Sequence, residues 1–188
     1  ESRDLSQTAS WCIGDYQAGG NNNFAGYITD ARITVGTAVY NGNFTPNTSP
    51  LTTLANTKLL LNMQNAGIPD LAMMNDLQTV GNAQVSTSTK KYGTGSISFD
   101  GSTSYLTEPY STLNDFGNGS FTIEAWVYPT SNPTNGPGTL IDCRSSATSE
   151  GWVVRLFNNL TVGIYDGPSN AYVNSTGTFT MNAWNHVA

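Results

Sequence analysis

Charged residues are scarce in this chain of 188 residues, and cationic ones are the scarcest. Seven Lys and Arg residues stand against 13 Asp and Glu residues, which gives a formal net charge of −6. Apart from the neighbours Lys90 and Lys91, the cations are scattered singly. A surface that tracks nucleic-acid phosphates needs clustered cations, so we expect no nucleic-acid partner.

Long apolar runs are also missing. No stretch approaches the roughly 20 apolar residues that a membrane helix needs, so we expect no membrane insertion. The first residue is Glu1, and nothing after it resembles a signal peptide. The missing Met suggests a processed or excised piece, in which targeting information is simply absent.

Cysteine is represented only by Cys12 and Cys143, and neither has another Cys or a His at metal-ligand spacing. Both lie in strand-like runs. We therefore expect two free, buried thiols that act as small hydrophobic side chains. The alternative is a disulfide, which would require the two strands to be neighbours in space.

Short β-branched and aromatic runs, separated by Gly, Asn, Pro and Ser clusters, make up most of the chain. This pattern is typical of an all-β sandwich or jelly roll. Only residues 70–77 have helical character, and they are too few for more than a single turn. Asn158 and Asn159 predict a two-residue hairpin, because Asn tolerates positive φ. Strands are predicted near residues 10–15, 26–35, 58–63, 82–86, 95–100, 104–107, 120–128, 138–143, 151–157, 160–165, 170–175 and 183–187.

Three groups of motifs carry a family resemblance. They are Gly-Tyr-Ile-Thr-Asp-Ala-Arg-Ile-Thr at 26–34 with Asn-Gly-Asn-Phe-Thr-Pro at 41–46, Ser-Ile-Ser-Phe-Asp-Gly-Ser at 96–102, and Phe-Thr-Ile-Glu-Ala-Trp-Val-Tyr-Pro at 121–129. With these motifs the chain resembles laminin-G-like, concanavalin A-like jelly-roll domains. Its particular form is similar to repeats in bacteriophage and marine viral structural proteins, such as tail fibres, appendages and capsid decorations.

The order of the motifs departs from that family. Residues 24–45 resemble the end of such a domain, whereas the segments after residue 57 resemble its opening. The resemblance therefore implies a two-sheet antiparallel β-sandwich that is circularly permuted or cut across two tandem repeats. We expect C-terminal strands in 1–45, a linker in 46–57, and N-terminal and central strands in 58–188, all in one compact permuted sandwich. Parts of two tandem sandwiches are the alternative.

One hairpin of the family pattern is missing after Trp-Asn-His-Val-Ala at 184–188. Its absence predicts an exposed strand edge near both termini, unless a neighbouring subunit or domain pairs with it.

Alternation divides residues 121–128 between two faces. The apolar set belongs in the core, and the other set, a carboxylate beside aromatics, is expected to face outward. Arg155 is expected to form a solvated ion pair with Glu124 across the sheet. The alternative for this surface is a sugar-contacting platform, since glycan binding uses aromatic faces and planar donors. The inward set is Phe121, Ile123, Ala125 and Val127, and the platform would comprise Glu124, Trp126, Tyr128 and Arg155.

Catalytic groups are not evident. Glycoside hydrolases share the fold that the resemblance implies, and they need two carboxyl groups roughly 5–9.5 Å apart. Glu124 has Trp126 and Tyr128 at the next two positions on its face, and the Glu-x-Asp-x-x-Glu pattern of the fold's glucanases is absent. His186, the only histidine, is expected to be a packed or hydrogen-bonded strand residue. We therefore expect that the protein is not an enzyme.

Calcium is the cofactor that the resemblance raises, because some laminin-G-like and pentraxin domains bind it. Roughly six to eight oxygen ligands would have to converge from loops, and no dense acidic cluster is present. Two of the candidates, Asp100 and Asp166, precede Gly and are better explained as turn formers. No other cofactor is expected. The candidate ligands are Asp15, Asp100, Asp142 and Asp166.

The resemblance implies adhesion or particle architecture. We expect a non-catalytic structural or adhesion module of a virion surface or tail appendage. Its expected location is the virion surface or the extracellular space. Its expected partners are other virion or surface subunits, in a homo-oligomer or repeat array, and host or environmental glycans. The alternatives are an accessory module of a carbohydrate-active enzyme and a repeat of an extracellular bacterial adhesin.

Overall fold

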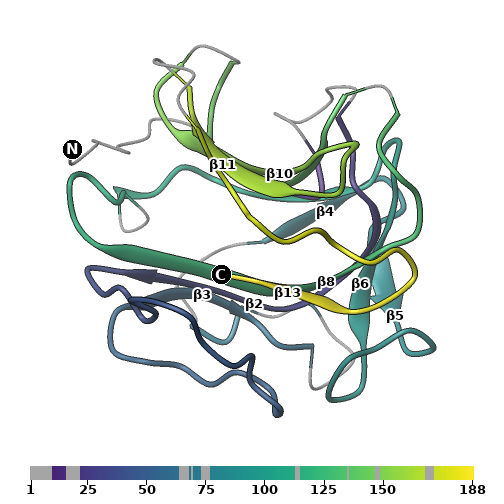
Figure 1. The fold of residues 1–188 in the computed structure, drawn as a ribbon, viewed down its shortest axis with the longest axis horizontal. Coiled ribbons are helices and arrows are strands. Elements are labelled where there is room, and N and C mark those ends of the chain that lie inside the picture. Colours follow the sequence, from purple (N-terminus) through teal and green to yellow (C-terminus); the bar gives the residue numbers. More distant parts are fainter. Residues whose placement is uncertain are drawn as a thin grey trace.

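In the computed structural model, the described residues form 13 strands in two sheets that face each other (Figure 1). The structure describes residues 10–15, 22–63, 68, 70–72, 77–112, 115–134, 136–146, 149–167 and 172–188. All strand pairs within the sheets are antiparallel. The chain therefore has the fold class that the sequence predicts, an all-β sandwich of two antiparallel sheets.

The two sheets draw strands from distant parts of the sequence. The seven-stranded sheet has the order β12-β11-β10-β9-β1-β7-β4, with β1 (Trp11–Ile13), β4 (Gln78–Val80), β7 (Tyr105–Glu108), β9 (Gly138–Asp142), β10 (Trp152–Leu156), β11 (Val162–Asp166) and β12 (Tyr172–Asn174). The six-stranded sheet has the order β13-β8-β2-β6-β5, with β3 also paired to β2. Its strands are β2 (Ala25–Val35), β3 (Thr57–Leu61), β5 (Gln84–Ser86), β6 (Ser96–Asp100), β8 (Phe121–Pro129) and β13 (Asn185–Val187).

The long strand β2 organises the six-stranded sheet. One of its edges pairs with β8 along almost its whole length, and the other pairs first with β6 and then with β3. A bulge lies between Thr29 and Arg32, where β2 has one more residue than β8. Asp30, inside the bulge, has a φ of 56°. Asp tolerates this left-handed conformation better than most side chains.

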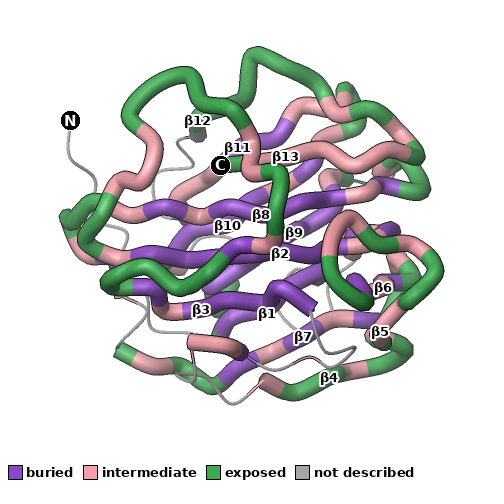
Figure 2. The backbone as a smooth tube through the Cα atoms, turned by 90° about the horizontal axis from the view of Figure 1, so that it is seen from below, coloured by how far each residue is buried: buried purple, intermediate pink, exposed green. Residues whose placement is uncertain are grey.

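The core lies between the sheets, and buried residues follow the middle of the strands (Figure 2). Trp11 and Trp152 meet edge to face with ring centroids 5.1 Å apart. Phe116 stacks on Trp152 at 4.9 Å. The predicted inward set of β8 also faces this core, so the alternation that the sequence indicates is confirmed.

The predicted strand regions agree well with the observed strands. Each of the twelve overlaps one, and of the described strands only β4 was not predicted, because a polar, mostly exposed run of three residues gives no periodic signal. Residues 71–72 form a turn within the single turn predicted at 70–77, whereas 73–76 lie outside the described residues. Among the described residues, no helix has the length and apolar character needed to cross a bilayer.

The hairpin between β10 and β11 differs from the prediction. The last strand pair is Leu156 with Val162, and the backbone N of Phe157 donates to the carbonyl of Thr161 at 2.9 Å, so three residues, not two, form the loop. Leu160, not an Asn, has the positive φ, 64°. The Oδ1 atom of Asn159 instead accepts hydrogen bonds from the backbone N and the Oγ1 of Thr161. Asn therefore closes this loop through its side chain.

Both cysteines are buried and neither forms a disulfide, so the disulfide alternative is wrong for this structure. The Sγ atom of Cys143 lies 3.1 Å from the backbone N and O of Trp152. Burial raises the pKa of Cys143 well above its usual range. The thiol therefore stays protonated in the core.

Strands from the first and last parts of the chain share both sheets. β1 lies between β7 and β9, and β2 lies between β8 and β6. The segment boundaries 1–45, 46–57 and 58–188 remain a prediction.

Residues 58–188 alone would lack one interior strand in each sheet. We expect that this piece does not unfold cooperatively, because β3, β6 and β8 lose the strand that joins them. Circular dichroism during thermal unfolding, with the full chain as reference, tests this. A cooperative transition of the piece at an unchanged temperature would favour two tandem sandwiches instead.

Candidate functional site

Residues 37–56, here called the strap, cover part of the outer face of the six-stranded sheet, which points away from the other sheet (Figure 1). The strap contains no strand and is fastened by side chains of the sheet. Asp30 accepts hydrogen bonds from the backbone N of Leu51, at 2.7 Å, and from Nδ2 of Asn47, at 3.0 Å. Nη1 of Arg32 donates to the carbonyl of Thr52 at 2.9 Å. The predicted linker 46–57 thus lies mostly within a segment that packs on the sheet.

An ion pair between Arg32 and Glu124 lies beneath the strap. The two residues face each other on β2 and β8, and their side chains are 5% and 0% exposed. The hydroxyl of Tyr40, from the strap, donates to Oε2 of Glu124 at 2.7 Å. Burial, and then the hydrogen bond and charge of Glu124, raise the pKa of Tyr40 to about 12. Tyr40 therefore remains a neutral donor at any physiological pH.

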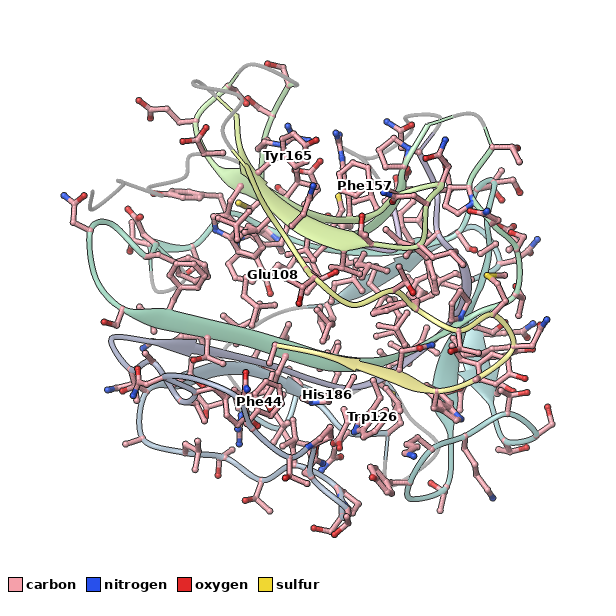
Figure 3. All side chains as sticks on the ribbon, in the orientation of Figure 1. Phe44, Glu108, Trp126, Phe157, Tyr165 and His186 are labelled. Carbon is pink, nitrogen blue, oxygen red and sulfur yellow. The ribbon has the colours of Figure 1, made fainter. Side chains whose placement is uncertain are left out.

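His186 completes this buried cluster. Its ring lies between Phe44 and Trp126, with centroid distances of 5.5 and 5.0 Å (Figure 3). Burial, and then the charge of Arg32, lower the pKa of His186 to about 4. The imidazole is therefore neutral at pH 7, and its 3.8 Å contact with Glu124 is not an ion pair at that pH. The prediction of a packed strand histidine is confirmed.

The residues of β8 that were predicted to face outward, Glu124, Trp126 and Tyr128 among them, have a different environment from the one expected. They do point away from the core, but Glu124 is fully buried and Trp126 is 8% exposed. The strap, Lys91 and Tyr92 cover them: Nε1 of Trp126 donates to Oδ1 of Asn47 at 3.3 Å. The prediction of a solvent-exposed carboxylate was wrong, because a polar segment without periodicity gives no sign of what it covers.

Arg155 does not pair with Glu124. It lies on β10 in the seven-stranded sheet, where its guanidinium carbon is 5.8 Å from the ring centroid of Tyr165. Arg32 takes the predicted role, from the strand directly beside β8. The structure therefore separates Arg155 from Glu124, Trp126 and Tyr128.

An open row of aromatic side chains lies beside the strap-covered cluster on the same face. Tyr27 pairs with Tyr128 across β2 and β8, and their ring centroids are 5.8 Å apart. Trp184 lies 5.4 Å from Tyr128, just before β13. All three are partly exposed, and we call them the aromatic row. Ser98 and Gln84 continue the row across β6 and β5.

The aromatic row was only partly predictable. Tyr128 belonged to the predicted platform, but Tyr27 and Trp184 did not. They join Tyr128 only through the register of β2 and β13 against β8, which a single sequence does not reveal.

Two acidic residues lie on the strap side of the sheet, where the sequence indicated only Glu124. Asp30 reaches this side through the bulge, and the charge of Glu124 contributes to raising its pKa, after the larger effect of burial. Both carboxyl groups are fully buried. A substrate therefore has no direct path to either of them.

The candidate calcium ligands are engaged elsewhere. Asp142 forms a buried, two-point ion pair with Arg144, with both N–O distances 3.0 Å. Asp100 accepts hydrogen bonds from its own turn, which hold its pKa well below its usual range although burial alone would raise it. Asp15 is buried after β1, and Asp166 ends β11.

Within the described part of the chain, no three His, Cys, Asp or Glu side chains form a group that could hold a metal. The structure therefore does not bring these four aspartates together in one group.

Comparison with known proteins gives one match. Residues 100–188, a little under half of the chain, match the family model Laminin_G_3, described as the concanavalin A-like lectin/glucanases superfamily. No curated protein and no solved structure matches the chain. The match supports the resemblance carried by the sequence motifs, and it favours a carbohydrate-binding or adhesion-type module. Tyr128 and Trp184 lie in the matched part.

Replacement of Glu124 by Gln should destabilise the protein. The change leaves the buried Arg32 without its counter-charge, and the free energy of unfolding should fall by about 3–5 kcal/mol. Glu150→Gln, at an exposed position, is the matched control and should change it by less than about 0.5 kcal/mol. Urea unfolding measures both. Equal values for the two variants would contradict the buried pair.

Acid should destabilise the fold through His186. Because its pKa is lowered in the fold, the unfolded chain takes up the proton first as the pH falls. Stability should be lost between about pH 6.5 and pH 4, by up to about 3 kcal/mol. Asp30 and Asp142 have raised pKa values, so acid does not destabilise the fold through them. The lowered pKa of Asp100 changes the stability of the fold mainly below this pH range.

Urea unfolding at several pH values tests this expectation. His186→Gln should remove most of the loss between pH 6.5 and 4. An equal loss in this variant would show that another group is responsible.

Proposed function

We propose that the protein is a non-catalytic adhesion module that binds glycans on the outer face of its six-stranded sheet. The aromatic row of Tyr27, Tyr128 and Trp184 is the observation that carries this proposal. Aromatic side chains pair an apolar ring with a polar atom, and sugars have apolar ring faces edged by hydroxyl groups. Rings at 5.8 and 5.4 Å spacing present such surfaces on neighbouring strands.

Polar neighbours support the same surface. Ser98 and Gln84 extend the row with hydroxyl and amide groups, which donate and accept hydrogen bonds. The neutral, uncharged character of the row favours neutral glycans. The enclosed position of Asp30 and Glu124 supports binding without catalysis, because neither acid can reach a bound sugar.

We further propose that the module belongs to the surface or tail appendage of a virus particle, in a homo-oligomer or repeat array with other surface subunits. The resemblance of the motifs at 26–34, 41–46, 96–102 and 121–129 to repeats of viral structural proteins supports this setting. The low content of cations supports the absence of a nucleic-acid partner. Antibodies against this chain should label the surface of intact particles. Labelling of a bacterial cell surface alone would favour the adhesin alternative.

Glycan binding is tested by replacing the aromatic row. Tyr27→Ala, Tyr128→Ala and Trp184→Ala should each weaken the binding of a glycan found on an array by at least about tenfold, or about 1.4 kcal/mol. Tyr110→Ala is the matched control, because Tyr110 is 42% exposed and lies outside the row.

Two results would contradict the proposal. One is the absence of any glycan binding by the folded chain, and the other is an equal loss in Tyr110→Ala. Release of reducing sugar from a glycan would contradict the non-catalytic part and favour an enzyme.

A further inference from the structure

Side chains from three separate segments meet at the edge of the strap. Nζ of Lys91, in the connection between β5 and β6, lies 4.1 Å from the ring centroid of Trp126 on the outer face of β8 (Figure 3). Nε1 of the same indole donates a hydrogen bond to Oδ1 of Asn47, in the strap, at 3.3 Å. An amine and a carboxamide that are distant in the sequence therefore contact one indole ring.

Tyr92 holds the two segments together. Its hydroxyl donates to the backbone carbonyl of Asn47 at 2.6 Å, and its ring meets that of Trp126 edge to face at 6.0 Å. Nζ of Lys91 lies 5.4 Å from the centroid of the Tyr92 ring. Lys91 is only partly buried, and its stem is flexible. Its amine can therefore turn toward the side chain of Asn47 while the backbone of both segments stays in place.

A carboxyl group lies on the other side of the same amide. Oδ2 of Asp30 accepts a hydrogen bond from Nδ2 of Asn47 at 3.0 Å, and Oδ1 is fixed by the backbone N of Leu51 at 2.7 Å. Asp30 is fully buried, and burial raises its pKa, which favours uptake of a proton by this carboxyl group. A general acid or base must lie within hydrogen-bond reach of the atom that it serves. Asp30 has that position relative to Nδ2.

We propose that the folded chain joins Lys91 to Asn47 by an intramolecular isopeptide bond, with Asp30 and Trp126 as the catalytic residues. Transfer of an amide group needs a nucleophilic amine, a donor to the carbonyl oxygen and an acid at the leaving nitrogen. Lys91, Nε1 of Trp126 and Oδ2 of Asp30 supply these three functions in turn. A hydrogen bond that only fastens the strap would need neither the amine nor the indole.

The reaction balances without an added reagent. The ammonium group of Lys91 gives one proton to water, and the neutral Nζ attacks Cγ of Asn47. Trp126 stabilises the negative charge that forms on Oδ1. Asp30 takes a second proton from Nζ and passes it to Nδ2. The bond between Cγ and Nδ2 breaks, ammonia leaves, and Nζ keeps one hydrogen in the new amide.

This inference goes beyond glycan binding. The bond ties the strap to the segment before β6 and keeps it on the sheet when its hydrogen bonds open, which suits a module that holds a surface under load. The reaction occurs once, on the chain itself, and involves no bound sugar. Lys91→Gln should therefore bind glycans as the unaltered chain does, so failure of either proposal leaves the other standing.

Intact mass spectrometry of the folded chain tests the bond. After incubation at neutral pH, the mass should be lower than that of the sequence by one ammonia. Trypsin digestion of the denatured product should then release one branched peptide, in which residues 33–58 are joined through Lys91 to residues 91–144. The full sequence mass after incubation would overturn the proposal. This measurement needs no variant to fold.

Variants assign the reacting groups. Lys91→Gln should retain the full sequence mass, whereas Lys90→Gln, at the exposed neighbouring position, is the matched control and should lose ammonia. Asp30→Asn keeps the shape of the side chain but cannot pass the proton, and it should slow the reaction by at least about a hundredfold. Near-ultraviolet circular dichroism checks that this variant is folded.

Three results of these experiments would overturn the proposal. The first is loss of ammonia without a branched peptide, which would indicate a succinimide at an Asn-Gly pair such as Asn41-Gly42. The second is a branched peptide that forms through Lys90. The third is an unchanged rate in folded Asp30→Asn, which would remove the catalytic role of that carboxyl group.

Discussion

The buried ion pair between Arg32 and Glu124 is the interaction on which the outer face of this sandwich depends. Two charges without solvent are costly unless each is closely matched by the other and by hydrogen bonds. Tyr40 and the carbonyl of Thr52 supply those bonds from the strap. The pair therefore fixes β2 against β8. Its hydrogen bonds to Tyr40 and Thr52 also hold the strap, a polar segment without periodicity, on the sheet.

The strap divides the outer face into two regions with different capabilities. Beneath it, the acids Asp30 and Glu124 are enclosed with a neutral His186, and none of the three is exposed enough to meet a large substrate. Beside it, the aromatic row remains partly open. Closure of the charged region and openness of the aromatic one are consistent with recognition without chemistry.

The sequence allowed the strands and the faces of β8 to be predicted, because a period of two is a local property. It did not allow the partner of Glu124 to be predicted. Arg155 and Arg32 are both on strands with suitable alternation, and only the assignment of strands to sheets distinguishes them. The burial of Trp126 was missed for a related reason: the covering residues come from a segment without a pattern. Likewise, Tyr27 and Trp184 join Tyr128 only through register.

The bulge in β2 has a consequence for the length of that strand. Ile28 faces the core before the bulge, and Ala31 and Ile33 face it afterwards, so the side chains change parity at Asp30. Without the additional residue, either Tyr27 and Thr29 or Arg32 and Thr34 would point between the sheets. The parity of this stretch therefore does not tolerate the insertion or deletion of a single residue. A shift by one residue would exchange the inward and outward side chains in half of the strand. The guanidinium group of Arg32 could then point into the apolar core.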